Sequence, residues 1–391
     1  MMDLSPVHKV ASLACVIGVI FGAVANKTNF CTMGAVSDWV NLGDKGRLRA
    51  WLLAIGVAIL LSHGMQWLGW IELNQAIYLT PNLGWLGYLL GGALFGIGMT
   101  LASGCGQRTL VRVGGGNLKS LVVMLFLGLT AYMTMRGLLA LVRVNLIDVS
   151  SVDLGALGMQ DQGIGTLLAT AAGIDDDTWV TRALAFLLGG GLFLYAFWDT
   201  EFRRSFDNML AGLVIGFIIA SGWYVTGVIG FDDFEPVRFE SYTFVAPTGD
   251  SLQYLMTFTG ATINFGIAAV FGVILGSFLY TVSTRKFRIE FFVSRDDMIR
   301  HILGGILMGF GGVLALGCTV GQGITGMSTL ALGSLLVLCS IIFGSALTMK
   351  TEYYLMDDLG FSSALRHALS DMKLFPGPKP AGTDPTSGNR D

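Results

Sequence analysis

Charged residues are scarce in this sequence. Only 13% of its 391 residues are Asp, Glu, Lys or Arg, whereas soluble domains carry about 25%. Hydrophobic residues make up 53%, and the mean hydropathy is +0.66. This balance excludes an ordinary soluble domain and is typical of an integral membrane protein. The formal net charge is −3, so there is no basic excess that would favour a nucleic-acid partner, and we expect none.

Residue patterns that build common catalytic and metal sites are also missing. The chain has four histidines and no CxxC, GxSxG, HExxH or GxxxxGK[ST] pattern. The stretch "RVGGGN" at 112–117 looks like a phosphate loop but lacks that last pattern and a preceding soluble strand. Nothing in the sequence therefore points to hydrolytic catalysis or to a bound cofactor.

Apolar runs near the length of a membrane crossing, about 20 helical residues, recur along the chain. There are nine of them: roughly 10–25, 51–70, 86–103, 120–143, 182–200, 209–229, 255–281, 301–316 and 332–349. The first ends at Ala23-Val24-Ala25, which resembles a signal-peptide cleavage site, but its leader has only a weak basic region and we expect no cleavage. The pattern predicts an all-α membrane protein with one transmembrane domain over 1–350.

Lys and Arg in the connections predict the orientation, because cytoplasmic loops are enriched in them. Two acidic stretches, 145–178 and 231–250, should face outward. Three connections should be cytoplasmic, and their cations are Lys45, Arg47 and Arg49, then Arg203 and Arg204, then Arg285, Lys286, Arg288, Arg295 and Arg300. With nine crossings, the N-terminus is then periplasmic and the tail at 351–391 is cytoplasmic, with a Pro-, Gly- and Ser-rich end that we expect to be disordered.

An internal repeat relates two of the runs. Residues 89–105 align with 302–318 without a gap and share ten identical pairs in seventeen, among them five glycines and a cysteine. The loop charges make the first copy run inward and the second outward, so the repeat is inverted. Inverted repeats are common in secondary transporters, which bind substrate near the midplane between the halves. We expect the halves to cover about 10–143 and 209–349.

Glycines interrupt both copies at their ends. Gly104, Gly106, Gly317 and Gly321 follow directly on apolar helical patterns. Broken backbone at membrane depth is tolerated only where protein or a water-lined cavity satisfies it. We therefore expect short re-entrant helices and loops here.

Three of the five cysteines share this setting: Cys31, Cys105 and Cys318 each lie at the edge of an apolar segment beside polar or glycine residues. Cys15 and Cys339 lie inside apolar runs and are expected to pack as small hydrophobic residues. Cys31, Cys105 and Cys318 could form a disulfide, could hold Cu(I) through thiolates, or could contact a soft, sulfur-containing solute. A thiol is a weak donor and acceptor, which suits a passing solute.

Polar groups near these cysteines would favour an anion. Residues that follow Cys105 and Cys318 can open short helices whose N–H groups point at negative charge. The alternative is that the cations belong to an ordinary cytoplasmic loop and the others satisfy local backbone. The candidate anion contacts are Lys27, Asn29, Thr32, Gln107, Arg108, Thr319 and Gln322.

The motifs "NFCTMGAVSD", "GGALFGIGMTLASGCGQR" and "GGILMGFGGVLALGCTVGQG" resemble those of the YeeE/YedE family of bacterial inner-membrane proteins, whose characterised members take up thiosulfate. The resemblance covers roughly 10–350. It implies an hourglass-shaped channel between two pseudo-symmetric halves, with Cys31, Cys105 and Cys318 along its axis. It further implies that the ion's terminal sulfur passes between thiols through S–H···S hydrogen bonds, and that a small TusA-like sulfur-carrier protein is a partner.

The family does not fix every point. Some relatives are linked to other sulfur or selenium anions. A membrane enzyme that relays a persulfide or electrons through the same cysteines, or a metal importer, would also place thiols in the membrane. We expect a transporter rather than an enzyme.

Overall fold

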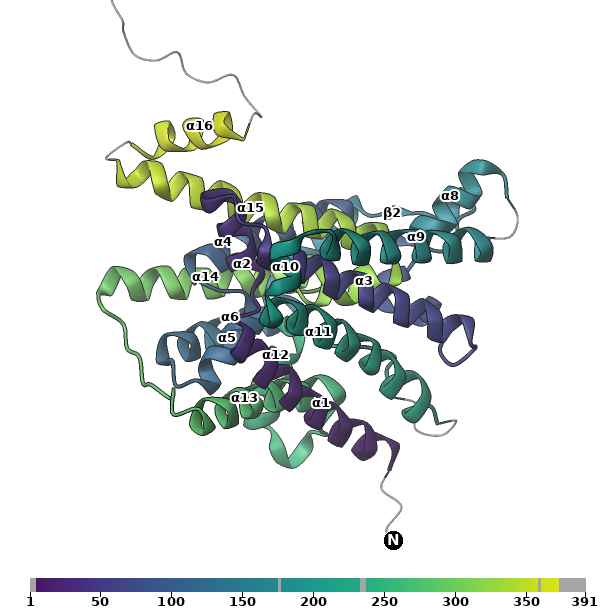
Figure 1. Ribbon diagram of the computed structural model, residues 1–391, viewed down its shortest axis with the longest axis horizontal. Coiled ribbons are helices and arrows are strands. Elements are labelled where there is room, and N and C mark those ends of the chain that lie inside the picture. The colour runs from purple at the N-terminus through teal and green to yellow at the C-terminus, as the bar shows by residue number, and fades with distance from the viewer. Residues whose placement is uncertain (1–4, 175–176, 233–236, 358–359, 373–391) are drawn as a thin grey trace, which may run out of the picture. The chain divides into compact units, whose positions relative to one another are not determined.

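The protein is helical almost throughout. The computed structural model describes residues 5–174, 177–232, 237–357 and 360–372. In this part, nine helical stretches are long and apolar enough to cross a membrane, which confirms the predicted all-α integral membrane protein (Figure 1). Among the described residues, one two-stranded antiparallel ladder joins β1 (Asn82–Leu83) to β2 (Val152–Asp153).

Each of the nine stretches overlaps one of the nine predicted runs, and one start differs more than the others. The run expected from 255 begins at Phe265, because the 3-10 turn Phe258–Gly260 and an extended segment separate it from a shorter helix. The helices are α1 (Pro6–Thr28), α2 (Thr32–Ser37), α3 (Gly46–Trp67), α4 (Trp85–Leu101), α5 (Gly106–Gly114), α6 (Leu118–Arg136), α7 (Leu139–Val142), α8 (Ile164–Ala172), α9 (Asp177–Trp198), α10 (Thr200–Arg204), α11 (Phe206–Tyr224), α12 (Val245–Met256), α13 (Phe265–Ser283), α14 (Arg295–Leu314), α15 (Leu332–Met356) and α16 (Phe361–Asp371).

The chain divides into two compact units, residues 1–345 and 346–391. The second unit contains the end of α15 and the helix α16. Within it, the Lys350 ammonium lies 3.2 Å from the Asp371 carboxylate, and the Tyr354 hydroxyl donates to the same carboxylate at 2.7 Å. The end of the tail expected to be disordered falls in 373–391, outside the described residues.

Glycines set the closest helix packing in the first unit. Gly18 and Gly22 of α1 face Gly272 and Gly276 of α13, with backbone against backbone. Both pairs have the small-xxx-small spacing that lets helices approach closely in lipid. Because the contact pairs advance in the same direction along both helices, α1 and α13 are parallel, as the predicted alternation of nine crossings requires.

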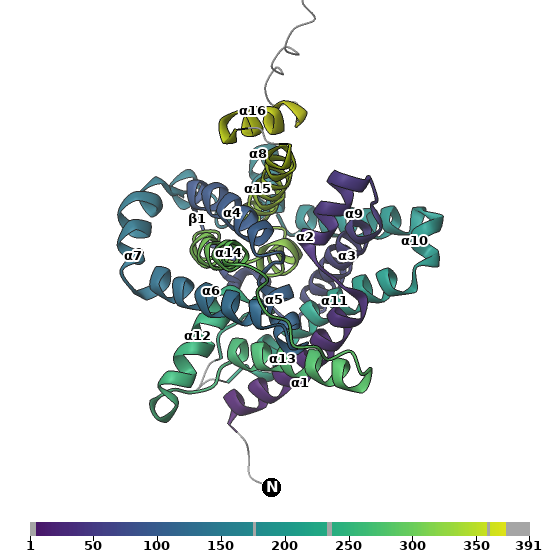
Figure 2. The ribbon, with the colours of Figure 1, turned by 90° about the vertical axis from the view of Figure 1, so that its left-hand side faces the viewer.

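The two repeat copies pack against each other with exchanged contacts. A Cβ added at Gly98 of α4 would lie 2.7 Å from the Gly304 carbonyl oxygen of α14, and one added at Gly91 would lie 2.6 Å from that of Gly311. Gly91 and Gly98 are the repeat equivalents of Gly304 and Gly311, so each contact maps onto the other. The helices are antiparallel, as an inverted repeat predicts; Figure 2 shows them side by side.

The same relation extends to the next helix of each copy. Gly96 of α4 packs on the Ile341 backbone of α15, and its equivalent Gly309 of α14 packs on the Leu127 backbone of α6. Leu127 and Ile341 are equivalent once the single extra residue in the second copy is counted. The repeat therefore governs helix packing and not only the sequence of one segment.

Both repeat helices end with the same turn. Ser103 and Leu316, which are equivalent, take left-handed backbone conformations with φ of 55° each. The next residues, Gly104 and Gly317, donate backbone N–H groups to Met99 and Gly312 carbonyls at 2.8 Å in both copies. The break was expected at the glycines, but the left-handed residue comes one position earlier in both copies. This is a C-terminal helix cap that satisfies free carbonyls.

The residue that follows each re-entrant segment forms a backbone hydrogen bond with a distant connection. The Leu118 N–H donates to the Glu290 carbonyl at 3.0 Å, and its equivalent Leu332 donates to the Gln162 carbonyl at 2.9 Å. The acidic segment at 145–178 thus supplies one of these acceptor carbonyls, and the basic connection before α14 supplies the other.

Candidate functional site

Each of the three predicted cysteines immediately precedes a helical turn. Cys31 is the N-cap residue of α2 and Cys105 that of α5. Cys318 precedes a turn and the π-helix Gly321–Gly326, and the Gly321 N–H donates to its sulfur at 3.3 Å. All three thiols are buried and free. Helix N-termini carry partial positive charge and exposed N–H groups, so these positions favour electron-rich ligands.

The three cysteine segments meet in space. The Cys31 and Cys105 thiols interact with each other. The Thr319 hydroxyl approaches the Cys105 thiol without a well-aligned hydrogen bond, and Thr319 directly follows Cys318. Cys318 in turn contacts Thr243. Thr319 thus links the interacting pair Cys31 and Cys105 to the segment that carries Cys318, and we call these three cysteines the cysteine group.

Two buried polar side-chain atoms next to the cysteine group have no hydrogen-bond partner among the described residues. The Cys105 S–H lies 3.9 Å from Gln107 Oε1, but Gln107 Nε2 and Thr319 Oγ1 are buried with no hydrogen bond to any described residue. A buried polar group left unpaired costs about 1–3 kcal/mol. Such groups next to thiols are what a site for a small polar ligand would contain before the ligand binds.

Arg108 connects the thiols to a basic cavity. Its guanidinium donates to Asn29 Oδ1 at 2.9 Å, which ties the loop before Cys31 to helix α5. Arg108 also lines a cavity of about 510 Å³, which we call the basic cavity. The cations in its wall are Arg108, Arg112, Lys119, Lys286 and Arg288.

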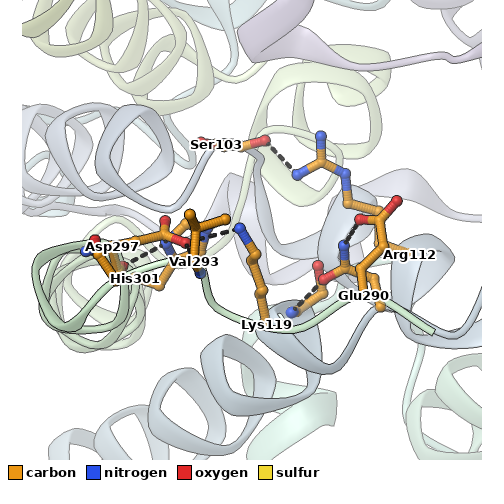
Figure 3. A network of polar contacts seen from close by, with 10 residues as sticks. Ser103, Arg112, Lys119, Glu290, Val293, Asp297 and His301 are labelled. Atoms are coloured by element: carbon orange, nitrogen blue, oxygen red, sulfur yellow. Dashed lines mark hydrogen bonds and ion pairs between the residues drawn. The ribbon is translucent and has the colours of Figure 1, made fainter.

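The two carboxylates of the basic cavity have local partners, as Figure 3 shows. The Lys119 ammonium lies 2.7 Å from Asp297, whose carboxylate also lies 3.1 Å from His301 Nδ1. The amide of Asn117 donates to Glu290. With five cations against two carboxylates, the basic cavity favours anions.

A second cavity of about 460 Å³ lies next to the Cys318 segment, because Thr243 and Gly317 form part of its wall. We call it the mixed-charge cavity, because it also contains Arg238, Glu240 and Asp250. Burial raises the pKa of Glu240 to about 7; Arg238 lowers this pKa and Asp250 raises it. Burial also raises the pKa of Asp250. Near neutral pH, this cavity can therefore lose or gain negative charge.

The remaining predicted contacts lie in different places. The Lys27 ammonium sits over the Phe206 ring, 5.3 Å from its centroid, and Lys27 is not among the residues that line the basic cavity. Thr32 is the buried first residue of α2. The Gln322 side chain holds its own loop, because it donates to the Ala315 carbonyl at 2.6 Å and accepts from Ser334 Oγ at 2.6 Å.

The glycines around the cysteines lie where side chains have little room. Gly321 faces Thr243 so closely that an added Cβ would collide with its hydroxyl, and Gly317 lies 3.1 Å from Gln322 Cγ by the same measure. Gly104 faces Arg108 Cγ at 3.2 Å, whereas Gly106 has more room, with Leu127 nearest at 3.6 Å.

Sequence reasoning missed three residues near the site. Thr243 and Glu240 come from the acidic connection, which was treated only as an outward-facing loop. Trp51 lies inside an apolar helix, and its ring stacks on that of Phe30, beside Cys31. Nothing in the local sequence separates these residues from neighbours of the same type, so only the fold could find them.

Metal ligation has little support in the side-chain arrangement. Within the described ranges, no group of three or more His, Cys, Asp or Glu side chains could hold a metal ion.

The chain is similar to known transport proteins along most of its length. It is 26% identical over 343 residues to the thiosulfate transporter TsuA of Escherichia coli (strain K12), covering 79% of this chain and 85% of the relative. It is 25% identical over 334 residues to the thiosulfate transporter TsuA of Spirochaeta thermophila, covering 84% of this chain and 95% of the relative. The model of the family described as sulphur transport matches residues 27–347. This match spans all nine apolar helices at least in part and all three cysteine segments, and it confirms the expectation of a transporter rather than an enzyme: the chain belongs to the sulphur transport family.

Proposed function

We propose that this multi-pass membrane protein takes up thiosulfate through a pathway lined by Cys318, Cys105 and Cys31. The names of both relatives support this substrate. The observation that carries the pathway is the pair of unpaired buried groups, Gln107 Nε2 and Thr319 Oγ1, beside the interacting thiols of Cys31 and Cys105. Thiosulfate has a soft terminal sulfur and three oxygens, so it could engage both kinds of group at once.

In this mechanism the thiols act as weak hydrogen-bond partners and form no covalent bond. The terminal sulfur accepts S–H···S contacts from successive thiols, while Gln107 and Thr319 donate to the oxygens. Weak contacts allow release, which conduction requires. The Arg108 guanidinium attracts the dianion toward the basic cavity, and Asn29 holds that guanidinium in place.

The orientation and the halves of the pathway follow from the charges and the repeat. We propose that the protein lies in the bacterial inner membrane with a periplasmic N-terminus and a cytoplasmic tail over 351–391. The mixed-charge cavity then opens outward and the basic cavity inward. The halves, about 10–143 and 209–349, would each supply one Gly-Cys segment. In this proposal Lys27, Thr32 and Gln322 help to hold these segments in place and do not contact the anion. Asn29 affects the anion only by positioning the Arg108 guanidinium.

The direct test is uptake of radiolabelled thiosulfate by a host without its own thiosulfate and sulfate importers. We expect uptake that excess unlabelled thiosulfate suppresses, with weaker competition from sulfate, sulfite and selenite. Expression of a variant with alanine at all three pathway cysteines provides the background. Uptake unaffected by excess thiosulfate would reject the proposal, and stronger competition by selenite or sulfite would reassign the substrate within the same class of anion.

Thiosulfate uptake is expected to rise as the external pH falls from 8 to 6. The raised pKa of Glu240, about 7, means that this carboxyl is neutral below that pH and negative above it, where it repels a dianion. Two charges some 8 Å apart interact by about 2 kcal/mol at an effective dielectric constant of 20, so the expected change is several-fold. Initial rates should become nearly independent of pH in Glu240→Gln.

The matched control is Glu72→Gln, since Glu72 lies on the same predicted side but outside the cavity and bonds to Gln75. It should keep the wild-type pH profile. A Glu240→Gln profile as steep as that of the wild type would show that another group titrates.

We also propose a small TusA-like sulfur-carrier protein as a cytoplasmic partner, on the strength of the family resemblance. The exposed cations Lys286 and Arg288 would face it. Co-purification from a host that expresses both proteins tests this, and its failure in low-salt buffer would contradict it.

A further inference from the structure

Trp51 carries a third buried group without a partner, on a ring that packs against the residue before Cys31. Its side chain is 3% exposed, and its indole N–H forms no hydrogen bond with any described residue. Buried tryptophan N–H groups usually find an acceptor. The exception here is therefore a feature that the packing alone does not explain.

The position of the ring places it between two of the cysteine segments. Its plane is almost parallel to that of Phe30, with 5.9 Å between ring centroids, and Phe30 directly precedes Cys31. The outer benzene edge of the ring, which does not carry the N–H, meets Gly323 in the re-entrant segment after Cys318, where an added Cβ would lie 2.7 Å from Trp51 Cη2. Trp51 thus touches the segments that carry Cys31 and Thr319.

We propose that the Trp51 N–H is a specificity-determining contact, which donates to an oxygen of the sulfur oxyanion. This inference rests on the proposed function and deepens it. Gln107, Thr319 and Trp51 then supply one donor for each of the three oxygens, while the thiols contact the terminal sulfur. A site with fixed donors rejects ligands that leave them unpaired, so the three donors select a sulfonate-like group over a bare sulfur anion.

Trp51→Phe separates this role from a structural one. Phenylalanine keeps an aromatic ring against Phe30 and removes the N–H. Hydrogen bonds to a charged group are among the stronger ones, so we expect the KM for thiosulfate to rise about tenfold to a hundredfold. Because the N–H has no partner in the protein, its removal should leave the melting temperature of the purified protein unchanged or raise it.

Trp85→Phe is the matched control, because the Trp85 N–H donates to the Ser150 carbonyl at 2.9 Å, away from the cysteines. It should leave the KM at the wild-type value. An unchanged KM in Trp51→Phe would overturn the inference, and so would a rise in KM accompanied by a clear fall in melting temperature, since that pattern indicates lost packing.

Thiosulfate transport by the wild type tests the proposed function independently of the Trp51 inference. If it transports thiosulfate but Trp51→Phe has the same KM, only the Trp51 inference fails. If the wild type does not transport thiosulfate, the proposed substrate fails, and the KM of the oxyanion that it does carry tests Trp51.

Discussion

Cys105→Ala is expected to reduce thiosulfate uptake at least about tenfold and as much as a hundredfold. Cys105 is fully buried, contacts Cys31 and the Thr319 hydroxyl, and lies beside Gln107. Alanine removes the S–H group that the proposed mechanism places against the terminal sulfur of the anion. A hydrogen bond to a charged group contributes about 1.5–3 kcal/mol, and each 1.4 kcal/mol corresponds to a factor of ten. The measurement is the initial rate of labelled uptake, corrected for the amount of protein in the membrane.

Cys105→Ser distinguishes hydrogen bonding from covalent transfer. A hydroxyl still donates, so the proposed mechanism retains partial uptake in Cys105→Ser and shows no adduct on wild-type cysteines by mass spectrometry of the intact protein. A thiol relay would lose all activity in the serine variant and would leave a persulfide or mixed disulfide on the wild type. The contact between Cys31 and Cys105 is the observation that makes this second mechanism worth testing.

Cys339→Ala is the matched control for both variants. Cys339 is exposed on α15 and is not among the groups that interact with Cys31, Cys105 or Cys318. Its uptake should equal that of the wild type. A loss in Cys339→Ala as large as that in Cys105→Ala would mean that cysteine replacement harms the protein in general.

Gly276→Ala is expected to destabilise the protein by several kcal/mol, or to prevent its recovery in folded form. An added Cβ would overlap the Val19 carbonyl oxygen of α1, which is backbone and cannot turn away. The two helices would have to separate along their small-residue faces, and effects of this kind belong to the largest that single substitutions produce. Thermal unfolding in detergent, followed by the fraction that stays monodisperse, measures the loss.

Gly190→Ala makes the same substitution in another membrane helix without the steric cost. Apart from the neighbouring residues and the nearby backbone of its own helix, no atom of the described structure lies within 4 Å of a Cβ added at Gly190 of α9. Alanine is favoured over glycine in a helix by about 1 kcal/mol, so this variant should be as stable as the wild type or more so. Equal melting temperatures for the two variants would contradict close packing of α1 and α13.

Much of the fold could be predicted from local sequence. Low charge and nine apolar runs are properties of segments, and burial in lipid demands internally paired backbone, which favours helices. The repeat could be found because ten identical residues fall within seventeen positions. Loop charges then implied its inversion, and the exchanged contacts of Gly91, Gly98, Gly304 and Gly311 agree with it. The start of the helix at Phe265 was predicted too early, at 255, since Leu255 and Met256 at the end of α12 and Phe258 and Ile263 before α13 continue the apolar pattern.

The candidate site divides in the same way. Cys31, Cys105 and Cys318 stood out because polar and glycine residues surround them in an apolar sequence. Only the tertiary structure decides which side chains lie next to these thiols, because their neighbours come from segments that are far apart in the chain. Lys27 lies over Phe206, Gln322 bonds to its own loop, and Trp51 and Thr243 contact the cysteine segments instead. The sequence by itself determined that three thiols lie where helices break in the membrane, since helix-breaking patterns are local. The fold alone determined their neighbours, since helix packing brings distant residues together.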